Sequence, residues 1–136
     1  MVKITGTYEG NLRIRSTHGP SGTVIVTDAP VDNHGKGESF SPTDLCAAAM
    51  ASCMITIMGI AAANRGIALE GLRYEAEKIM SVDLPRRIAK LRIRMLMPPG
   101  IPAAARETLI RAANTCPVHH SLAPEIERDI EWVWPD

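Results

Sequence analysis

The sequence predicts an α+β fold built around one long, apolar helix. Three patterns support this prediction: short runs of alternating or β-branched residues near both ends, an uncharged stretch at residues 45–63, and an amphipathic helical pattern at residues 103–115. The expected order is three strands, the apolar helix, two strands, the second helix and a final strand. Because strands and helices do not alternate one by one, this order favours α+β over a parallel α/β sheet.

The first three strands are expected at residues 2–8, 12–15 and 23–27. Turn signals that contain glycine separate them, so an antiparallel three-stranded meander is the simplest arrangement. In the second strand Arg13 and Arg15 alternate with apolar residues, which places both arginines on one face. The polar stretch after the third strand is expected to be a loop.

The apolar helix is expected to begin at Ser41. Serine is a favourable N-cap, Pro42 suits the first helical position, and Asp44 occupies the capping-box position three residues after Ser41. No charged side chain lies between Leu45 and Ala63. A helix without a polar face is normally the buried centre of a soluble fold, and we expect that role here.

This helix is also long enough to cross a bilayer, but other features favour a soluble protein. It is rich in alanine, contains Ser52, Thr56 and Gly59, and lacks the flanking cations of a spanning segment. We expect a single domain over residues 1–136, and the formal net charge of zero gives no indication of a nucleic-acid partner. The first residues form no apolar signal region, so we expect a reducing, cytoplasmic location.

Four further elements are expected after the apolar helix. They are two strands at residues 69–80 and 88–97, a helix at 103–115, and a final strand at 126–134. Basic side chains alternate with apolar ones in the second of these strands, so one face of its sheet should meet water. The helix must stop before Pro117, because proline disfavours helical geometry in the preceding residue, and Cys116 therefore lies at a helix end.

The cysteines are the candidate chemical groups. Cys46 and Cys53 are seven residues apart on one helical stripe, about 10 Å from each other, which is too far for a disulfide. Each on its own is typical of a small buried hydrophobic residue. If the two helices pack together, however, Cys53 can approach Cys116 at the end of the second helix.

Two neighbouring thiols of this kind have a defined redox chemistry. A thiolate attacks a peroxide oxygen and becomes a sulfenic acid, which the second thiol traps as a disulfide. The attacking cysteine needs a lowered pKa, which a nearby cation such as Arg13 or Arg15 would supply. For both arginines a solvated strand face is the competing interpretation.

A zinc site is the alternative use of the same residues. Cys53, Cys116, His119 and His120 would supply four ligands of the kind that zinc takes. Structural zinc sites usually consist of two close pairs of ligands, and Cys46 is too far from Cys53 to complete a second pair. We therefore expect no metal.

Three short motifs carry a resemblance to a known family. They are Ser-Pro-Thr-Asp-Leu at residues 41–45, Ala-Ala-Ala-Met-Ala-Ser-Cys at 47–53, and Cys-Pro-Val at 116–118. With these motifs the chain resembles the OsmC/Ohr family of osmotically inducible and organic hydroperoxide resistance proteins. The resemblance implies an OsmC-like α+β fold, in which antiparallel sheets of two intertwined subunits wrap around long, buried central helices.

The resemblance also implies a function and a set of partners. It implies thiol-dependent reduction of organic hydroperoxides by a homodimer, with Cys53 as the peroxidatic and Cys116 as the resolving cysteine. The reductant would be a dithiol, such as a lipoylated protein. No metal, flavin or other cofactor, no nucleic acid and no membrane is implied.

The chain departs from the Ohr pattern near the start of the apolar helix. Ohr-type members carry a glutamate directly after the proline, where it pairs with the arginine that activates the thiolate. Here that position is Thr43 and the acid is Asp44, rotated by about 100° around the helix. The resemblance therefore makes Asp44 the candidate for the acid of this pair and Arg13, preferred to Arg15, the candidate for the arginine that activates the thiolate. The chain looks like a divergent OsmC-like branch, and the alternative function is an oxidant-sensing or small-molecule-binding protein without peroxidase activity.

Overall fold

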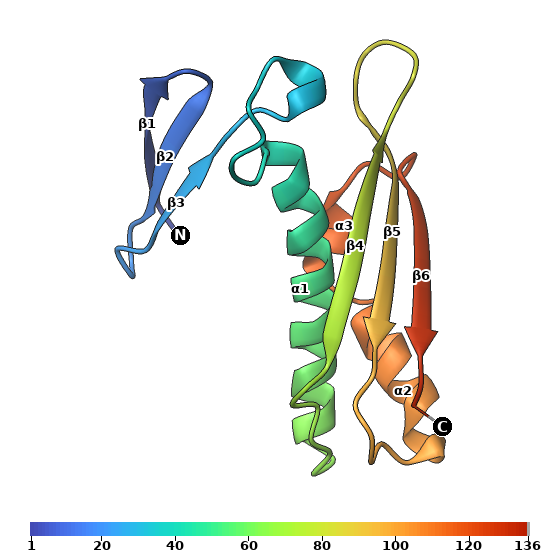
Figure 1. The fold of residues 1–136 in the computed structure, drawn as a ribbon. Coiled ribbons are helices and arrows are strands. Elements are labelled where there is room, and N and C mark those ends of the chain that lie inside the picture. Colours follow the sequence, from blue (N-terminus) through green and yellow to red (C-terminus); the bar gives the residue numbers. More distant parts are fainter. Residues whose placement is uncertain (136) are drawn as a thin grey trace. The chain divides into compact units, whose positions relative to one another are not determined.

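The computed structural model describes residues 1–135 and confirms the α+β class (Figure 1). It contains two three-stranded sheets. The chain contacts divide it into two compact units, residues 1–45 and the residues from Cys46 onward.

The N-terminal unit holds the predicted antiparallel meander. Its strands pair in the order β1–β2–β3. Asn11 and Leu12 connect the first two strands with φ angles of 55° and 63°, as a two-residue type I′ hairpin requires. The segment expected as a loop contains one short 3-10 turn, η1. The bounds are β1 (Ile4–Gly10), β2 (Arg13–His18), β3 (Val24–Thr27) and η1 (Val31–Asn33).

The long helix α1 (Pro42–Ala63) begins with the predicted capping box. The backbone N–H of Ser41 donates to Oδ2 of Asp44 at 2.9 Å, and the N–H of Asp44 donates to Oγ of Ser41 at 3.0 Å. Two otherwise unsatisfied N–H groups are thereby paired. The helix is followed by Gly66 in the left-handed conformation, with φ of 67°.

The expectation that α1 is buried on every side is wrong for the single chain. One stripe faces the core, and it consists of Ala47, Met50, Ala51, Met54, Met58 and Ala62. The opposite side is exposed to solvent, with Ile60 at 58% exposure. We call it the exposed stripe of α1; its residues are Ala49, Ser52, Thr56, Ile60 and Ala63.

Helix α1 is the one helix of residues 1–135 that is long and apolar enough to cross a membrane. Its core-facing stripe packs with strand and helix side chains of the second unit. In this fold α1 is therefore a core helix, as the sequence indicates.

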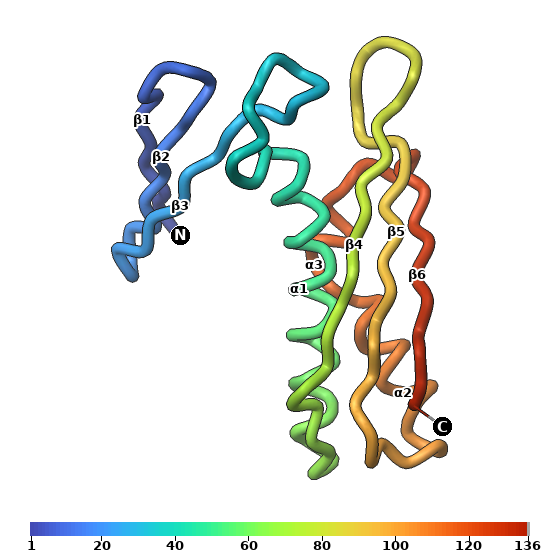
Figure 2. Tube along the Cα trace, in the orientation of Figure 1, coloured from blue at the N-terminus to red at the C-terminus, as the bar shows by residue number. Residues whose placement is uncertain are grey.

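The second unit contains a mixed sheet in the order β4–β5–β6 (Figure 2). Strands β4 and β5 are antiparallel, but β6 runs parallel to β5, so the expectation of purely antiparallel sheets is wrong for β6. The reason is the connection, because α2 and α3 carry the chain back to the end at which β5 begins. The bounds are β4 (Arg73–Met80), β5 (Ile88–Leu96), α2 (Ala103–Ala113), α3 (Pro117–Ser121) and β6 (Glu127–Val133).

The two faces of this sheet differ in chemistry. On the inner face, Leu91, Ile93 and Met95 of β5 are fully buried and form one cluster with the core residues of α1 and α2. On the outer face, basic side chains of β5 pair with acids on both neighbouring strands, as the predicted wet face requires. The pairs join Arg94 to Glu75 and Glu131, Arg92 to Glu77 and Asp129, and Lys90 to Glu127 and Asp129.

Candidate active site

Two of the three cysteines meet in the second unit. Cys53 lies on α1, is half-buried and packs against the core cluster, while Cys116 is fully buried within that cluster between α2 and α3. Cys53 lies near enough to Cys116 to raise the pKa of the Cys116 thiol. The structure thus brings together the pair that the sequence singled out as redox partners.

The Sγ atom of Cys116 is also the N-cap of α3. It accepts a hydrogen bond of 3.2 Å from the backbone N–H of His119, and Pro117 occupies the first helical position. Burial raises the pKa of the Cys116 thiol, and the neighbouring Cys53 raises it further, against the opposing effect of the His119 N–H. Cys116 is therefore a protonated thiol at neutral pH.

Arg128 of β6 holds the other end of α3, and it is not among the site residues that the sequence predicts. Its Nη1 donates to the carbonyl oxygens of Ala123 and Ile126, at 3.0 and 2.7 Å. Its Nη2 donates to those of His119 and Leu122, at 3.2 and 3.4 Å. The sequence does contain a signal for it. In the strand pattern of residues 126–134, Arg128 alternates in phase with the apolar residues Ile126 and Ile130, which places it on the same face of the strand.

His119 lies beside both Cys116 and Arg128. Burial lowers the pKa of its imidazole, and the positive charges of Arg128 and His120 lower it further, so the ring is neutral at pH 7. Its Nδ1 atom is buried and has no hydrogen-bond partner among residues 1–135. Within the same residues, no group of three or more His, Cys, Asp or Glu side chains is arranged to hold a metal ion, so the zinc alternative gains no support.

The predicted cation Arg13 belongs to the N-terminal unit, where two carboxylates surround it. Its Nη2 lies 2.6 Å from Oε2 of Glu38 and 3.6 Å from Oδ2 of Asp28. The hydrogen bond that the Arg13 guanidinium donates to Glu38 raises the pKa of Arg13 above its ordinary value. Asp28 is itself buried and accepts the backbone N–H groups of Ala29 and Glu38. The other eligible arginine, Arg15, pairs with Glu9.

The acidic candidate Asp44 has a structural task, since its carboxylate closes the capping box of α1. Thr43, which stands at the position of the Ohr glutamate, has its hydroxyl 3.2 Å from that of Ser41. Cys46 is half-buried nearly two turns before Cys53 on the same helix.

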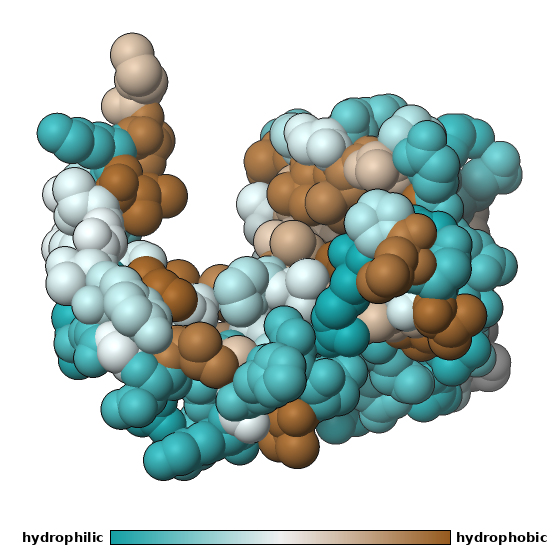
Figure 3. Space-filling view, turned by 90° about the horizontal axis from the view of Figure 1, so that it is seen from above, coloured by the Kyte–Doolittle hydropathy of each residue, from teal (hydrophilic) through white to brown (hydrophobic). Residues whose placement is uncertain are grey.

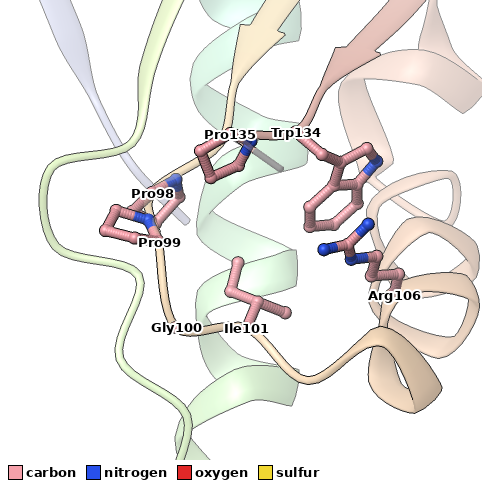
Figure 4. Close-up of a pocket in the computed structure, with 7 residues that line it drawn as sticks. All are labelled: Pro98, Pro99, Gly100, Ile101, Arg106, Trp134 and Pro135. Carbon is pink, nitrogen blue, oxygen red and sulfur yellow. The ribbon is translucent and has the colours of Figure 1, made fainter.

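A surface pocket of about 320 Å³ opens elsewhere in the second unit (Figure 4). Arg106 near the start of α2 lies over the ring of Trp134, 4.3 Å from its centroid. Cys116 follows the opposite end of α2, so this pocket does not contain the cysteine pair. Its lining consists of Pro98, Pro99, Gly100, Ile101, Arg106, Trp134 and Pro135.

Comparison with known proteins agrees with the family indicated by the motifs. The family of OsmC-like proteins matches residues 35–131. A protein of Psychrobacter arcticus 273-4, provisionally named an osmotic stress induced and detoxification response protein, is 41% identical. Its structure superimposes with a TM-score of 0.92 over 98% of this chain and 96% of that one. No curated protein matches the sequence.

More distant structures share the fold. An organic hydroperoxide resistance protein OsmC from Legionella pneumophila is 15% identical, with a TM-score of 0.77 over 98% of this chain and 97% of that chain. The organic hydroperoxide resistance protein OhrB of Bacillus subtilis is 16% identical, with a TM-score of 0.71 over 98% of each chain. The chain belongs to the OsmC-like protein family.

Proposed function

We propose that this protein is a thiol-dependent peroxidase that reduces organic hydroperoxides, with Cys53 as the peroxidatic and Cys116 as the resolving cysteine. The observation that carries the proposal is that two free thiols, one half-buried and one fully buried, belong to one core cluster and lie near enough for Cys53 to raise the pKa of Cys116. Membership of a family that includes hydroperoxide resistance proteins supports a redox or stress-response role.

The proposed reaction has two steps at the cysteines. The Cys53 thiol loses its proton, and the thiolate attacks the terminal oxygen of the hydroperoxide. The O–O bond breaks, Cys53 becomes a sulfenic acid, and the alkoxide takes up the proton that Cys53 released and leaves as the alcohol. The Cys116 sulfur then attacks the sulfenic sulfur, and the thiol proton leaves with the hydroxide as water. A dithiol reductant restores both thiols by exchange.

The surroundings of the pair suit an apolar peroxide. Cys53 packs against a cluster that contains the buried side chains of Met50 and Met54 and the half-buried Val118. Such a lining favours an alkyl or aryl hydroperoxide over hydrogen peroxide, since it offers apolar contact and few hydrogen bonds.

Activation of Cys53 is assigned in this proposal to Arg13. A cation near the sulfur favours the thiolate, and the carboxylates of Glu38 and Asp28 would orient the guanidinium. Asp44 contributes by fixing the first turn of α1, the helix that carries Cys53.

The working form in this proposal is a cytoplasmic homodimer. The exposed stripe of α1 is one apolar surface that a second copy would cover. One face of the N-terminal sheet is another, and Ile4 and Tyr8 on it are 66% and 62% exposed. Figure 3 shows that hydrophobic side chains, drawn in brown, reach the surface of the molecule. Contiguous exposed apolar surface is typical of interaction sites.

Turnover tests the proposal directly. Reduced protein is mixed with cumene hydroperoxide and dihydrolipoamide, and peroxide loss is followed. We expect catalytic loss by the wild type, none by Cys53→Ser, and less than one-tenth of the wild-type rate by Cys116→Ser, roughly the scale for losing a participating group. Cys46→Ser is the matched control and should match the wild type; wild-type loss no faster than that of Cys53→Ser contradicts the proposal.

The second candidate function is an oxidant sensor without turnover. It is favoured by Thr43, whose hydroxyl bonds within the helix cap at the position of the Ohr glutamate. A sensor would consume a stoichiometric amount of peroxide and form the Cys53–Cys116 disulfide once, without recycling by dihydrolipoamide. The same assay therefore separates the two functions.

A further inference from the structure

The side chain of Arg128 lies on the inner face of the mixed sheet. In the register of β5 and β6 it is paired with Leu91, which is fully buried, while its neighbours Glu127 and Asp129 take part in the ion pairs of the outer face. An arginine on the core side of a strand must find hydrogen-bond partners, because an unpaired buried charge is strongly unfavourable.

Arg128 finds its partners in the backbone around α3. The four carbonyl oxygens that it contacts belong to the C-terminal part of this five-residue helix and to the loop that leads into β6. Carbonyls at a helix end have no partner within the helix. The planar guanidinium, with donors on both terminal nitrogens, can serve several of them at once, whereas a lysine ammonium is a point donor.

We propose that Arg128 is a positioning residue for Cys116: by fastening the C-terminal end of α3 to β6, it keeps the Sγ atom at the N-terminal end of that helix beside Cys53. The inference rests on the two-cysteine reaction proposed above. Helix α3 spans only Pro117–Ser121, so a movement at one end is transmitted directly to the cap at the other.

The step that depends on this placement is disulfide formation. The Cys116 sulfur must reach the sulfenic sulfur of Cys53 in line with the departing hydroxide, which takes the thiol proton and leaves as water. A displacement of about 1 Å can slow such a step by about 100-fold. The preceding attack of Cys53 on the peroxide does not involve Cys116, so it should not depend on Arg128.

Two substitutions of Arg128 and one control separate this role from general folding. Arg128→Lys keeps the charge but not the forked geometry, and Arg128→Gln removes both. Arg111→Gln is the control, because Arg111 lies exposed on α2 and forms hydrogen bonds with the side chains of Glu107 and Thr108 on the same helix.

Each reduced protein is mixed with one equivalent of cumene hydroperoxide and quenched at intervals. Intact mass spectrometry after dimedone treatment then counts Cys53 sulfenic acid and the disulfide separately. We expect sulfenic acid to form at the wild-type rate in all variants, and the disulfide to form about 10-fold or more slowly in Arg128→Gln. The rate of disulfide formation in Arg128→Lys should lie between those of the wild type and Arg128→Gln, and the rate in Arg111→Gln should match the wild type.

Three results would overturn the inference. One is disulfide formation at the wild-type rate in Arg128→Gln. Another is an equal slowing of both steps, which indicates a folding role alone. If Arg128→Gln does not fold, Arg128→Lys replaces it, and disulfide formation at the wild-type rate in Arg128→Lys overturns the inference.

A second readout does not depend on peroxide chemistry. In a glutathione redox buffer, the equilibrium fraction of the Cys53–Cys116 disulfide reports how well the two thiols are placed. Arg128→Gln should need a more oxidising buffer than the wild type to form it, and an unchanged equilibrium contradicts the inference. If the wild type forms this disulfide in glutathione but does not react with peroxide, the proposed peroxidase function is refuted. The positioning role of Arg128 is then decided by the disulfide equilibrium in the glutathione buffer alone.

Discussion

The Sγ atom of Cys116 accepts the backbone N–H of His119 at 3.2 Å, so one sulfur is both the cap of α3 and the partner of Cys53. A helix cap satisfies an N–H group that has no partner inside the helix. The redox state of Cys116 is therefore linked to the start of a helix whose other end Arg128 holds.

The first prediction concerns this cap. Cys116→Ala removes the acceptor and leaves a small void in the core, so it should lower the free energy of unfolding by about 1–3 kcal/mol. Cys116→Ser retains an oxygen that can accept the hydrogen bond from the His119 N–H, and it should lower the free energy of unfolding by less. Urea unfolding of the reduced proteins measures both, and a serine variant less stable than the alanine variant contradicts the cap.

The second prediction is a pH dependence of stability. Burial raises the pKa of Cys116, so the folded protein holds this proton more tightly than the unfolded chain does. The stabilisation is complete below the pKa of the unfolded thiol and is lost as the pH rises through the higher pKa of the folded one. Unfolding followed in the alkaline range should show a steeper loss of stability for the wild type than for Cys116→Ser, and equal slopes would refute it.

The sequence was sufficient for those features that depend on local chemistry. Ser41 and Asp44 form the capping box that their spacing indicates. Cys53 and Cys116 were paired by their helical settings and by the family motifs, and the core brings them together.

Local sequence patterns do not predict the features that depend on long-range packing. The parallel direction of β6 depends on where α2 and α3 return the chain, which no local pattern records. Arg128 was overlooked because hydrophobic alternation describes apolar residues, and a charged residue at an inward position is meaningful only once its carbonyl partners are known. The exposed stripe of α1 was expected to be buried, since composition does not say whether the cover comes from the same chain.

The third prediction tests the capping box of α1. Ser41→Ala removes the oxygen that accepts the Asp44 N–H, and it should lower the free energy of unfolding by about 1 kcal/mol. Ser52→Ala is the matched control, because Ser52 lies on the exposed stripe within the same helix, where alanine is favourable. Thermal or urea unfolding compares the two, and an equal effect at both positions would exclude a capping role for Ser41.

The fourth prediction tests the proposed dimer. The wild type should sediment as a dimer, and Ile60→Asp should shift it toward the monomer, because a charge would be buried within the exposed stripe when two copies associate. Val82→Asp is the matched control, since Val82 is fully exposed in the β4–β5 connection, outside that stripe. A wild type that is monomeric at micromolar concentration, or an equal effect of both substitutions, contradicts a dimer through α1.

The fifth prediction concerns the ion pairs on the outer face of the mixed sheet. Arg92 lies 3.3 Å from Asp129 and 3.7 Å from Glu77, joining β5 to both neighbouring strands, yet its side chain is 42% exposed. Exposed pairs of this kind contribute little, so Arg92→Ala should lower the free energy of unfolding by less than about 1 kcal/mol. Added salt screens exposed charges, and the difference from the wild type should shrink between low and high ionic strength. Urea unfolding at two salt concentrations makes the measurement, and a loss that is larger or independent of salt shows instead that the aliphatic part of Arg92 contributes through packing.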